Sequence, residues 1–446
     1  MFLLPLPRCG AIMEADLAKH SRNAGTSSRA ATRTHVTWGE LLADAVIDVV
    51  ASKDRDGLDV LSWDGKRVFT APQIPYHGVV YLAPDLDPSI RQALRFPNGA
   101  TGYGSAVKLF TSITTVYREH LGLSEDLATF TTCWNLATWV PELMLVPLTM
   151  CVTATRCQVV NLFRMFRSLC RRPLMVAELS RRLPIFLHPT LLVDDPKLSA
   201  KACAFWCAAN LPGAVVSATG NRVCELACSK AVRLQPEDSP DAWGDEAMHL
   251  VLPPTEFPPL SDRLLASIAA EFQPQLEMYR LRRLNGKEKL TVPPSQLSKC
   301  ELARNLFTCI PDDAGIVRIL TPFLESHQQE LLARRSRNPQ VAIVKAVWIP
   351  AHEPGKMSVT DVAKRANALL RSDDEMYVYS PREVGWLLRK LRIQTHRTAN
   401  CRIVQFSSVV RQRVHELARE LGLQCAAVQG CPDCKELQAI DEYPVV

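Results

Sequence analysis

The pattern of hydrophobic and polar residues changes along the chain, and its middle part alternates between two kinds of segment. Between residues 125 and 258, apolar runs such as PLMVAEL (173–179) and TLLVDD (190–195) alternate with segments of helical spacing such as QVVNLFRMFRSLC (158–170). Near-continuous apolar runs suit strands that are covered on both faces. Strand–helix alternation favours a largely parallel sheet, so the predicted fold class of this domain is α/β.

The segments before this domain are less regular. Residues 1–36 are rich in Ser, Arg, Thr and Ala without a sustained apolar period, which predicts a disordered lead. Residues 37–124 are predicted to form a small α+β region. Within it, WGELLADAVIDVVA (38–51) has helical spacing, and the residues on either side of an Asp64-Gly65 turn are typical of a β-hairpin.

The segments after the α/β domain are mainly helical. Residues 259–338 have helical spacing throughout and are predicted to form a helical connector. Residues 339–423 add three helical segments, two short strands and a last helix. The third of these helices begins with a capping box, because Ser380 stands at the cap and Glu383 follows three residues later. Three helices followed by a two-stranded wing are typical of a winged helix-turn-helix.

Composition and charge change this picture only slightly. A chain of 446 residues predicts two or three domains, and a hydrophobic fraction of 47% predicts packed cores. The net charge of +6 permits a polyanionic partner only where basic residues cluster. The 15 cysteines are odd in number and no secretory signal precedes them, so reduced thiols in a cytoplasmic protein are expected.

One stretch could be mistaken for a membrane span. The run LATWVPELMLVPLTMCV (136–152) carries Glu142 and two prolines, and it falls short of the ~20 apolar residues that a bilayer requires. No membrane association is therefore predicted.

The order of elements in the α/β domain carries a resemblance to a known family. The run TLLVDD ends in Asp194 and Asp195, and SKAVRLQPEDSPDAWGDEAMHLVLP (229–253) follows it. This order of strand, loop, helix, strand, acid-ended strand, helix and strand resembles the ATPase core of mobile-element primase-helicases, within the P-loop ATPases. The resemblance implies that Asp194 and Asp195 are the candidate catalytic acids, for Mg²⁺ and for the attacking water.

Two departures from the family pattern predict that this core does not hydrolyse ATP. A phosphate-binding loop needs G-x-x-x-x-G-K-[ST], because its glycines let backbone amides face the phosphates and its lysine reaches the terminal phosphates. The corresponding segment, TATRCQ (153–158), contains neither glycine nor lysine. It leaves Thr153, Thr155 and Arg156 as the candidate nucleotide-binding residues. Where the family has a phosphate-sensing arginine, the chain has Glu246, whose charge would repel the anion.

The two aspartates then have two interpretations. In the structural one, Asp195 ends the strand before Pro196 and caps the next helix, as aspartate commonly does. In the functional one, the pair retains a Mg²⁺ or nucleotide pocket. An active ATPase with an unorthodox loop is the competing enzyme hypothesis.

The predicted winged helix concentrates positive charge. Residues 381–413 contain eight Lys or Arg residues and a single acidic one, Glu383. In a winged helix the third helix enters the major groove and the wing contacts the neighbouring backbone. The candidate nucleic-acid-binding residues are Arg382, Arg389, Lys390, Arg392, Arg397 and Arg402. DNA is the favoured partner, a protein partner remains open because winged helices also bind proteins, and Trp386 is expected in the core.

The tail at residues 424–446 offers half of a metal site. It contains Cys425, Cys431 and Cys434, and a Cys-x-x-Cys with a third cysteine nearby is half of a zinc site. The fourth ligand would come from elsewhere, such as His415. The alternative is a loose tail with free thiols. Mg²⁺ at the aspartates and Zn²⁺ at this tail are the only cofactors that the sequence leaves open.

These domains together predict a function based on binding. The sequence favours a non-catalytic, nucleic-acid-associated accessory protein of a mobile element, with an inactivated ATPase-like core and a DNA-binding winged helix. An atypical active ATPase or helicase-like enzyme and a protein–protein scaffold are the alternatives.

Overall fold

The structure is a computed structural model. It describes residues 33–179, 187–195, 198–211, 213–217, 223–225, 227–235, 240–244, 247–255, 259–286, 291–297, 300–337, 339–372, 378–399, 401–421, 423, 431 and 434. Most of the predicted disordered lead, residues 1–32, therefore lies outside the described residues. Its last four residues form a strand, β1 (Arg33–Val36). Among the described helices, none combines the length and the hydropathy that crossing a membrane requires.

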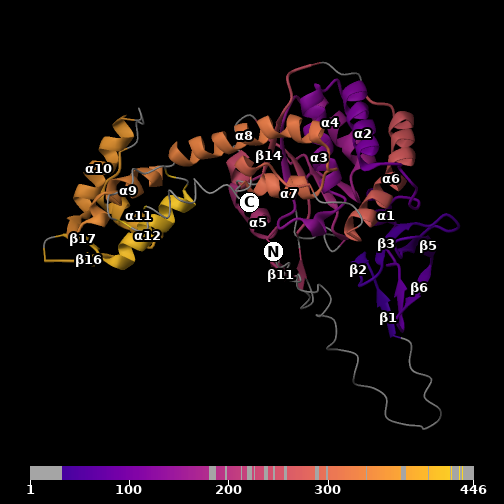
Figure 1. The fold of residues 1–446 in the computed structure, drawn as a ribbon, viewed down its shortest axis with the longest axis horizontal. Coiled ribbons are helices and arrows are strands. Elements are labelled where there is room, and N and C mark those ends of the chain that lie inside the picture. Colours follow the sequence, from indigo (N-terminus) through magenta and orange to yellow (C-terminus); the bar gives the residue numbers. More distant parts are fainter. Residues whose placement is uncertain are drawn as a thin grey trace, which may run out of the picture.

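Two small sheets form the N-terminal region (Figure 1). The four-stranded antiparallel sheet has the order β2 (Glu40–Leu41), β3 (Val46–Ala51), β4 (Leu58–Trp63), β5 (Val68–Ala71). The three-stranded sheet has the order β1, β7 (Val79–Leu82), β6 (Gln73–Tyr76), and β1 pairs with β7 in parallel. The expected turn is present, because the carboxylate of Asp64 accepts from the backbone amides of Lys66 and Arg67 at 2.7 Å each.

The helix expected over residues 38–51 is wrong, because this segment forms β2 and β3. The run VIDVVA is rich in β-branched residues, which favour strands. It lies between neighbours on both sides, and five of its six residues are buried, so the alternation that would have marked it as a strand is missing.

Four helical segments link this region to the α/β domain. They are α1 (Pro88–Ala93), α2 (Ala106–Leu121), α3 (Glu125–Ala137) and the short 3-10 helix η1 (Pro141–Leu143). Ser105 caps α2 and Ser124 caps α3, each with its side-chain oxygen accepting a backbone amide of the first turn.

The α/β fold class is confirmed by a five-stranded sheet in which every neighbouring pair is parallel. Its order is β14 (Met248–Val251), β8 (Thr149–Thr153), β13 (Lys230–Arg233), β10 (Thr190–Val193), β9 (Pro173–Val176). The acid-ended strand β10 is thus separated from β8 by β13. The intervening helices are α4 (Arg156–Leu169) and α5 (Ala200–Ala208).

Both faces of this sheet are covered. Met150 and Val152 of β8 belong to one hydrophobic cluster, which includes residues of α4, whereas Cys151 between them belongs to a second cluster that contains Trp206 of α5. Successive strand residues point to opposite faces, so the inner strands β8, β13 and β10 each contribute to two cores. The apolar runs of the sequence arise from this double burial.

The remaining elements of the larger unit are a short hairpin and a group of helices. They are β11 (Val215–Ser217), β12 (Val223–Glu225), η3 (Pro240–Trp243), α6 (Asp262–Leu284), η4 (Ser295–Leu297), α7 (Glu301–Thr308) and α8 (Ala314–Arg337). Leu276 of α6, Phe307 of α7 and Leu320 of α8 join the same hydrophobic cluster as Met150 of the sheet. The helices after the sheet therefore complete its core.

A separate unit follows at the far end of α8 (Figure 1). Its elements are α9 (Pro339–Trp348), η5 (Pro350–His352), β15 (Gly355–Ser358), α10 (Val359–Ser372), α11 (Pro381–Lys390), β16 (Thr395–Arg397), β17 (Arg402–Phe406) and α12 (Ser408–Glu420). The strands form an antiparallel sheet of order β15-β17-β16. The predicted capping box of α11 is present, with Ser380 and Glu383 each accepting the other's backbone amide. We call residues 339–434 the C-terminal unit.

A buried cluster of charges joins the N-terminal sheet to the larger core. Asp48 of β3 is 1% exposed and forms ion pairs with Arg171, Arg172 and Arg280. Arg280 lies on α6 and also forms a two-pronged pair with Glu142, at 2.7 Å to each carboxylate oxygen. Burial alone would raise the pKa of Asp48, but the three guanidinium groups outweigh it and hold the pKa well below its ordinary value. One carboxylate thus holds three segments together.

Candidate nucleotide, nucleic-acid and metal sites

The segment that was compared with a phosphate-binding loop is short. β8 ends at Thr153 and α4 begins at Arg156, so only two residues separate them. Thr155 caps α4: its hydroxyl accepts the amide of Gln158, and the Gln158 side chain accepts the amide of Thr155 at 3.0 Å. The amides of Thr155 and Gln158 are therefore engaged in a capping box.

The three candidate nucleotide-binding residues do not converge on one point. The hydroxyl of Thr153 is 2.9 Å from Nε2 of His249 on the neighbouring strand β14. Thr155 serves as the helix cap, and Arg156 is exposed to solvent. The side-chain amide of Gln158 also donates to the carbonyl of Pro253 at 2.7 Å, which ties the chain after β14 to the start of α4.

The two candidate catalytic aspartates have protein partners. Asp194 pairs with Arg233 at 3.0 Å, and Arg233 ends β13, the strand beside β10. Asp195 is buried, and its carboxylate accepts the backbone amide of Leu179 at 3.3 Å. The proposed capping role of Asp195 is wrong, because Ser199 caps α5 and accepts the amide of Ala202. Pro196 and Glu246 lie outside the described residues.

Arg233 is the residue at this sheet edge that the sequence reasoning missed. It sits at the carboxyl end of a parallel strand, where ligands of open α/β sheets bind. Here its guanidinium lies on a carboxylate of the same chain, which neutralises Asp194 locally. One of the two carboxylates at this edge is therefore paired with an arginine of the same chain, and the Asp195 carboxylate accepts a backbone amide.

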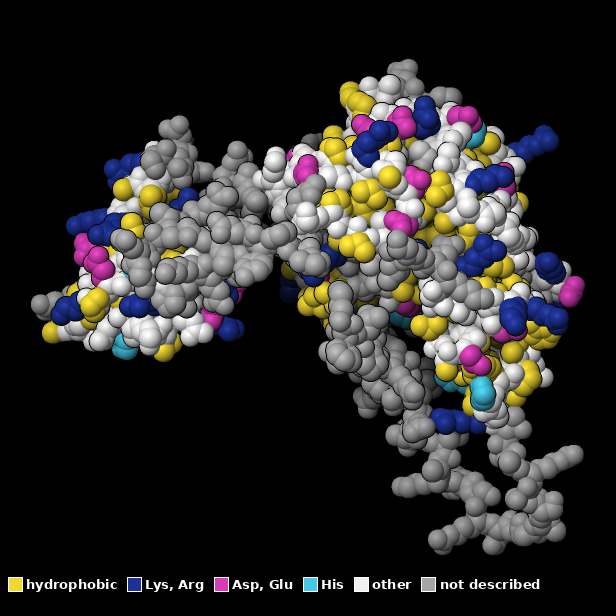
Figure 2. All heavy atoms as spheres, viewed as in Figure 1, with side chains coloured by type: hydrophobic (Ala, Val, Ile, Leu, Met, Phe, Trp, Pro, Cys, Tyr) yellow, Lys and Arg dark blue, Asp and Glu magenta, His cyan; other side chains and the backbone are white. Residues whose placement is uncertain are grey.

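The six candidate nucleic-acid-binding residues of the C-terminal unit are all exposed. On α11, Arg382, Trp386, Arg389 and Lys390 follow a spacing that places them on one helix face. The expectation that Trp386 lies in the core is wrong, since its side chain is 55% exposed. The ammonium of Lys390 lies 5.5 Å from the centre of the Trp386 ring. Figure 2 shows Lys and Arg side chains distributed over this unit.

The β16–β17 hairpin places two arginines directly opposite each other. Arg397 of β16 and Arg402 of β17 are cross-strand partners, and the turn between them is closed by Thr398, whose amide donates to the carbonyl of Cys401 at 2.8 Å. Like charges opposite each other destabilise a strand pair. Among the residues that the structure describes, no carboxylate forms an ion pair with either arginine.

Two other basic residues of the same segment are engaged within the fold. Arg413 pairs with Glu416 and Glu420 at 2.9 Å each and donates to the carbonyl of Leu391. Arg411 donates to the carbonyl of Ala351 at 3.0 Å, which fixes α12 against η5. Of these two, only Arg413 has its charge compensated by carboxylates among the residues that the structure describes.

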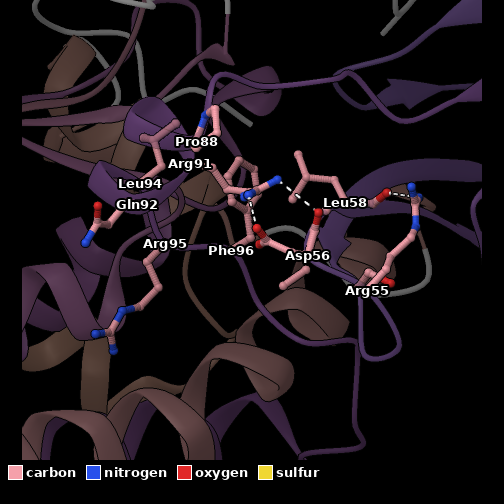
Figure 3. A pocket seen from close by; sticks show the side chains of 12 residues that line it. Arg55, Asp56, Leu58, Pro88, Arg91, Gln92, Leu94, Arg95 and Phe96 are labelled. Atoms are coloured by element: carbon pink, nitrogen blue, oxygen red, sulfur yellow. Dashed lines mark hydrogen bonds and ion pairs between the residues drawn. The ribbon is translucent and has the colours of Figure 1, made fainter.

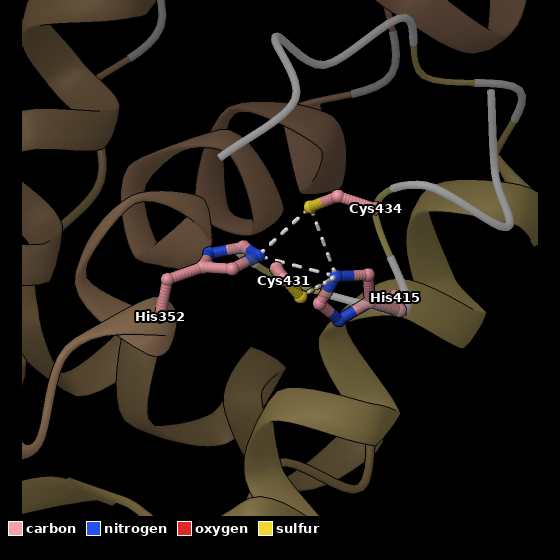
Figure 4. A group of neighbouring side chains, drawn as sticks. All are labelled: His352, His415, Cys431 and Cys434. Atoms are coloured by element: carbon pink, nitrogen blue, oxygen red, sulfur yellow. Dashed lines mark hydrogen bonds between the residues drawn. The ribbon is translucent and has the colours of Figure 1, made fainter. Parts of the chain in front are cut away.

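Four potential metal ligands converge beside α12 (Figure 4). They are Nε2 of His352, Nε2 of His415 and the sulfurs of Cys431 and Cys434, and these four atoms all lie within 4.8 Å of one another. His415 and both cysteines are buried. The sequence pointed to Cys431, Cys434 and His415, whereas Cys425 lies outside the described residues. It missed His352, which ends η5 far from the tail along the chain.

A separate cavity of about 560 Å³ lies between the N-terminal sheet and α1 (Figure 3). Two of its arginines are already paired. Arg91 binds Asp56 at 2.5 Å, and Arg55 binds Asp59 at 2.9 Å. The third, Arg95, has its pKa lowered by burial and by the nearby Arg167. The cavity contains no group that singles out a ligand or a reaction.

The comparisons with known proteins return distant structural overlaps. No protein-family model and no curated protein matches the sequence. The apo C-terminal region of NrS-1 has 7% identity over 81% of this chain and 97% of that chain, with a TM-score of 0.32. A second structure of that region has 8% identity over 81% and 96%, with a TM-score of 0.31. Cdc6p from Pyrobaculum aerophilum has 11% identity over 65% and 93%, with a TM-score of 0.15.

Overlaps of that size carry no argument about this chain, so its class rests on its own topology. The larger unit is an α/β protein built on a five-stranded parallel sheet with helices on both faces.

Proposed function

We propose that this chain is a nucleic-acid-associated accessory protein that acts by binding. In this proposal, residues 339–423 form a winged helix that binds duplex DNA. The α/β domain keeps the scaffold of a P-loop ATPase of the mobile-element primase-helicase kind but does not hydrolyse ATP.

The element order of the C-terminal unit supports the winged-helix part of the proposal. Three helices, α9, α10 and α11, are followed by the β16–β17 hairpin, and the hairpin pairs with β15 in one antiparallel sheet. In a winged helix this places α11 as the helix that enters the major groove and the hairpin as the wing. The capping box and Pro381 fix where α11 begins, and hence which side chains face outward.

The observation that carries the proposal is a surface of exposed, uncompensated basic residues on α11 and the wing. Arg397 and Arg402 oppose each other, and Arg382, Arg389 and Lys390 share one face of α11 with Trp386. Among the described residues, none of these charges has an ion-pair partner. A polyanion that supplies phosphates would relieve this repulsion, and bound phosphates provide affinity without sequence reading.

Duplex binding can be tested by fluorescence anisotropy over a series of salt concentrations. We expect the full-length chain to bind a short labelled duplex with an affinity that falls steeply with salt. The triple substitution Arg389→Ala, Lys390→Ala and Arg402→Ala should lower the affinity at least about tenfold. It should also flatten the slope of log K against log salt by about 0.9 for each phosphate that the variant no longer neutralises.

The matched control removes the same charge from the other end of the molecule. Lys53, Lys66 and Arg67 are exposed on the N-terminal sheet, and their replacement by alanine should leave duplex affinity nearly unchanged. Equal decreases in affinity for the two triple variants would mean that only net charge matters, and the proposed interface would be wrong. A chain that ignores DNA but retains a protein partner would instead support the scaffold alternative.

The loss of ATP hydrolysis is supported by the capping box at the start of α4 and by the Asp194–Arg233 ion pair. We expect phosphate release from Mg²⁺-ATP by the wild-type chain to equal that of Asp194→Ala. Turnover in the wild type that disappears in Asp194→Ala would establish the active-enzyme alternative instead.

A further inference from the structure

We propose that His352, His415, Cys431 and Cys434 bind a structural zinc ion that holds the C-terminal tail on the folded C-terminal unit. The site is independent of the DNA-binding surface, since its ligands lie on η5, α12 and the tail, while the basic residues lie on α11 and the wing.

The hydrogen bonds of the two histidines fix the orientation of their rings. Nδ1 of His352 lies 2.7 Å from the carbonyl oxygen of Trp348, and Nδ1 of His415 lies 2.8 Å from that of Arg411. A carbonyl oxygen only accepts hydrogen bonds, so each Nδ1 carries a proton and donates. In the neutral rings both Nε2 atoms then present lone pairs toward the cluster, as zinc-binding histidines do.

The four facing atoms are brought together more closely than uncharged acceptors would tolerate. The two Nε2 atoms are 3.1 Å apart, and Cys434 sulfur is 3.1 Å from one and 3.3 Å from the other. Two lone pairs at this distance repel unless a positive centre lies between them. Each thiol proton can be donated to only one of the facing nitrogens, whereas a single cation between the two nitrogens and two sulfurs attracts all four atoms.

Four of the six ligand-to-ligand distances are close to the edges of a zinc tetrahedron, and all four atoms lie within 4.8 Å of one another. Bonds of roughly 2.0–2.1 Å to nitrogen and 2.3 Å to sulfur place ligand nitrogens about 3.3 Å apart and nitrogen and sulfur about 3.6 Å apart. The cluster has 3.1 Å between nitrogens and 3.1, 3.3 and 3.6 Å between nitrogen and sulfur. Two thiolates with two imidazoles in this arrangement select zinc over the oxygen-loving cations.

The surroundings indicate a structural site rather than a catalytic one. Four protein ligands fill a tetrahedral shell and leave no open position for water or substrate. The ring of Trp348 packs beside both histidines, with ring centres 5.1 Å and 4.8 Å apart. Arg411 already fixes α12 against η5, so the folded unit holds the two histidines in place and the tail supplies the two cysteines.

Metal analysis of the full-length chain, purified without chelators, tests this proposal. We expect about one zinc ion per chain in the wild type. In Cys434→Ala and in His352→Ala the zinc content should fall about tenfold or more. The matched control is Cys401→Ala, because Cys401 is an exposed cysteine of the same unit outside the cluster, and it should keep the full zinc content.

Cobalt substitution in the wild-type chain gives a second test that does not depend on how the variants fold. Co²⁺ added to the metal-free protein should give the intense visible absorption of a tetrahedral centre and a near-ultraviolet thiolate-to-cobalt band. Zinc should then displace the cobalt. The proposal is overturned if the wild type binds no more zinc than Cys434→Ala and gives no such spectrum, or if mass spectrometry of fresh protein finds a Cys431–Cys434 disulfide.

Discussion

Asp48 is a buried carboxylate that forms ion pairs with three arginines. A buried carboxylate costs free energy unless its charge is matched. Asp48 is matched by three guanidinium groups, from the segment after α4 and from α6. Because these arginines need the carboxylate as much as it needs them, removing it would leave several uncompensated charges in the core.

Neutralising Asp48 should therefore be strongly destabilising. We expect Asp48→Asn, which keeps the shape of the side chain, to lower the free energy of unfolding by about 3–5 kcal/mol. Urea denaturation followed by circular dichroism measures the change. Asp54→Asn, at an exposed position of the same region, should change it by less than about 0.5 kcal/mol. Similar decreases in both variants would contradict this role of Asp48.

Glu277 makes the free energy of unfolding depend on pH. Burial, reinforced by the nearby Asp48 carboxylate, raises the pKa of Glu277 from 4.5 to about 8. Between these values the unfolded chain releases a proton that the folded chain retains, so the free energy of unfolding decreases as pH rises through this window.

Replacing Glu277 by glutamine should remove that decrease. We expect Glu277→Gln to gain stability relative to the wild type between pH 5 and pH 8, by on the order of a few kcal/mol. Chemical denaturation at several pH values measures the difference. Glu271→Gln, an exposed change on the same helix, should show no such trend. A constant difference between Glu277→Gln and the wild type would argue against a raised pKa.

At the residue scale, contacts between residues close together in the chain could be predicted from the sequence, whereas contacts between residues far apart in the chain could not. The Ser380–Glu383 capping box and the Asp64 turn each depend on residues close together in the chain, and both are present. His352 joins its cluster only through the fold. Trp386 was misplaced because its apolar neighbours Leu387 and Leu388 suggested a core stripe that turns away from it.

At the scale of the elements, the residue that follows the C-cap of α11 has a strained backbone conformation that lowers the free energy of unfolding. Leu391 is its C-cap, and Arg392 follows with φ of +58°, a left-handed conformation that usually belongs to glycine. The amide of Arg392 donates to the carbonyl of Arg389, and that of Ile393 donates to Leu388 at 2.8 Å, which completes a Schellman motif. An arginine in this position costs stability, which fits a residue retained for its charge.

The substitution Arg392→Gly tests separately the backbone conformation of residue 392 and the charge of its side chain. We expect it to raise the free energy of unfolding by about 0.5–1 kcal/mol, because glycine adopts this conformation without strain. It should also weaken duplex binding, because the exposed charge is removed. Arg392→Ala is the matched control: it removes the same charge but keeps the strain, so it should weaken binding without stabilising the fold. Stabilities from thermal denaturation and affinities from anisotropy check both outcomes.

Element prediction succeeded where one face of a segment is exposed or the segment is long. The helices α4, α6, α10, α11 and α12 were all expected from their spacing, as were β9, β10 and β13. It failed at β3, which is buried along nearly its whole length, and at β15, whose four residues provide no alternation to read. β15 pairs with β17, which is distant in sequence, whereas β3 pairs with the next strand, β4, and is hidden by its burial rather than by a distant partner.

At the scale of the whole molecule, the main core of the larger unit is separate from the core of the C-terminal unit, and two further clusters lie within the larger unit. The main core contains residues from Val46 to Leu324, the C-terminal core residues from Ala342 to Cys434, and among the described residues the two share no member. Each core is large enough to unfold cooperatively by itself.

Calorimetry of the full-length chain should therefore resolve two unfolding transitions. If zinc holds the tail, a chelator should lower the Tm of the C-terminal transition and leave the other within error. Cys434→Ala should reproduce the chelator's effect without any chelator. A single transition, or two transitions that shift together, would show that the cores are coupled.

The candidate sites could be foreseen from the sequence to different degrees. The exposed basic residues of α11 and the β16–β17 hairpin could be listed from the sequence because they lie close together in the chain, and their role in nucleic-acid binding stays a prediction. The two aspartates at the end of β10 were picked out from the sequence, but the pairing of Asp194 with Arg233 needed the strand order, in which β13 lies beside β10. Two members of the His–Cys cluster were visible as Cys-x-x-Cys and His415 was a candidate, whereas His352 could be placed only by the tertiary structure.

The long helix α8 has a geometric consequence for any ligand that spans both units. Its early residues Ile316, Leu320 and Leu324 are buried in the larger core, while its later turns lead away to the C-terminal unit (Figure 1). An α-helix rises about 1.5 Å and turns about 100° per residue. One residue inserted near its exposed end would therefore swing the C-terminal unit about a quarter of a revolution, and roughly seven would restore its heading some 10 Å farther out. A partner that touches both units would bind such insertion variants with an affinity that rises and falls in step with the helical repeat.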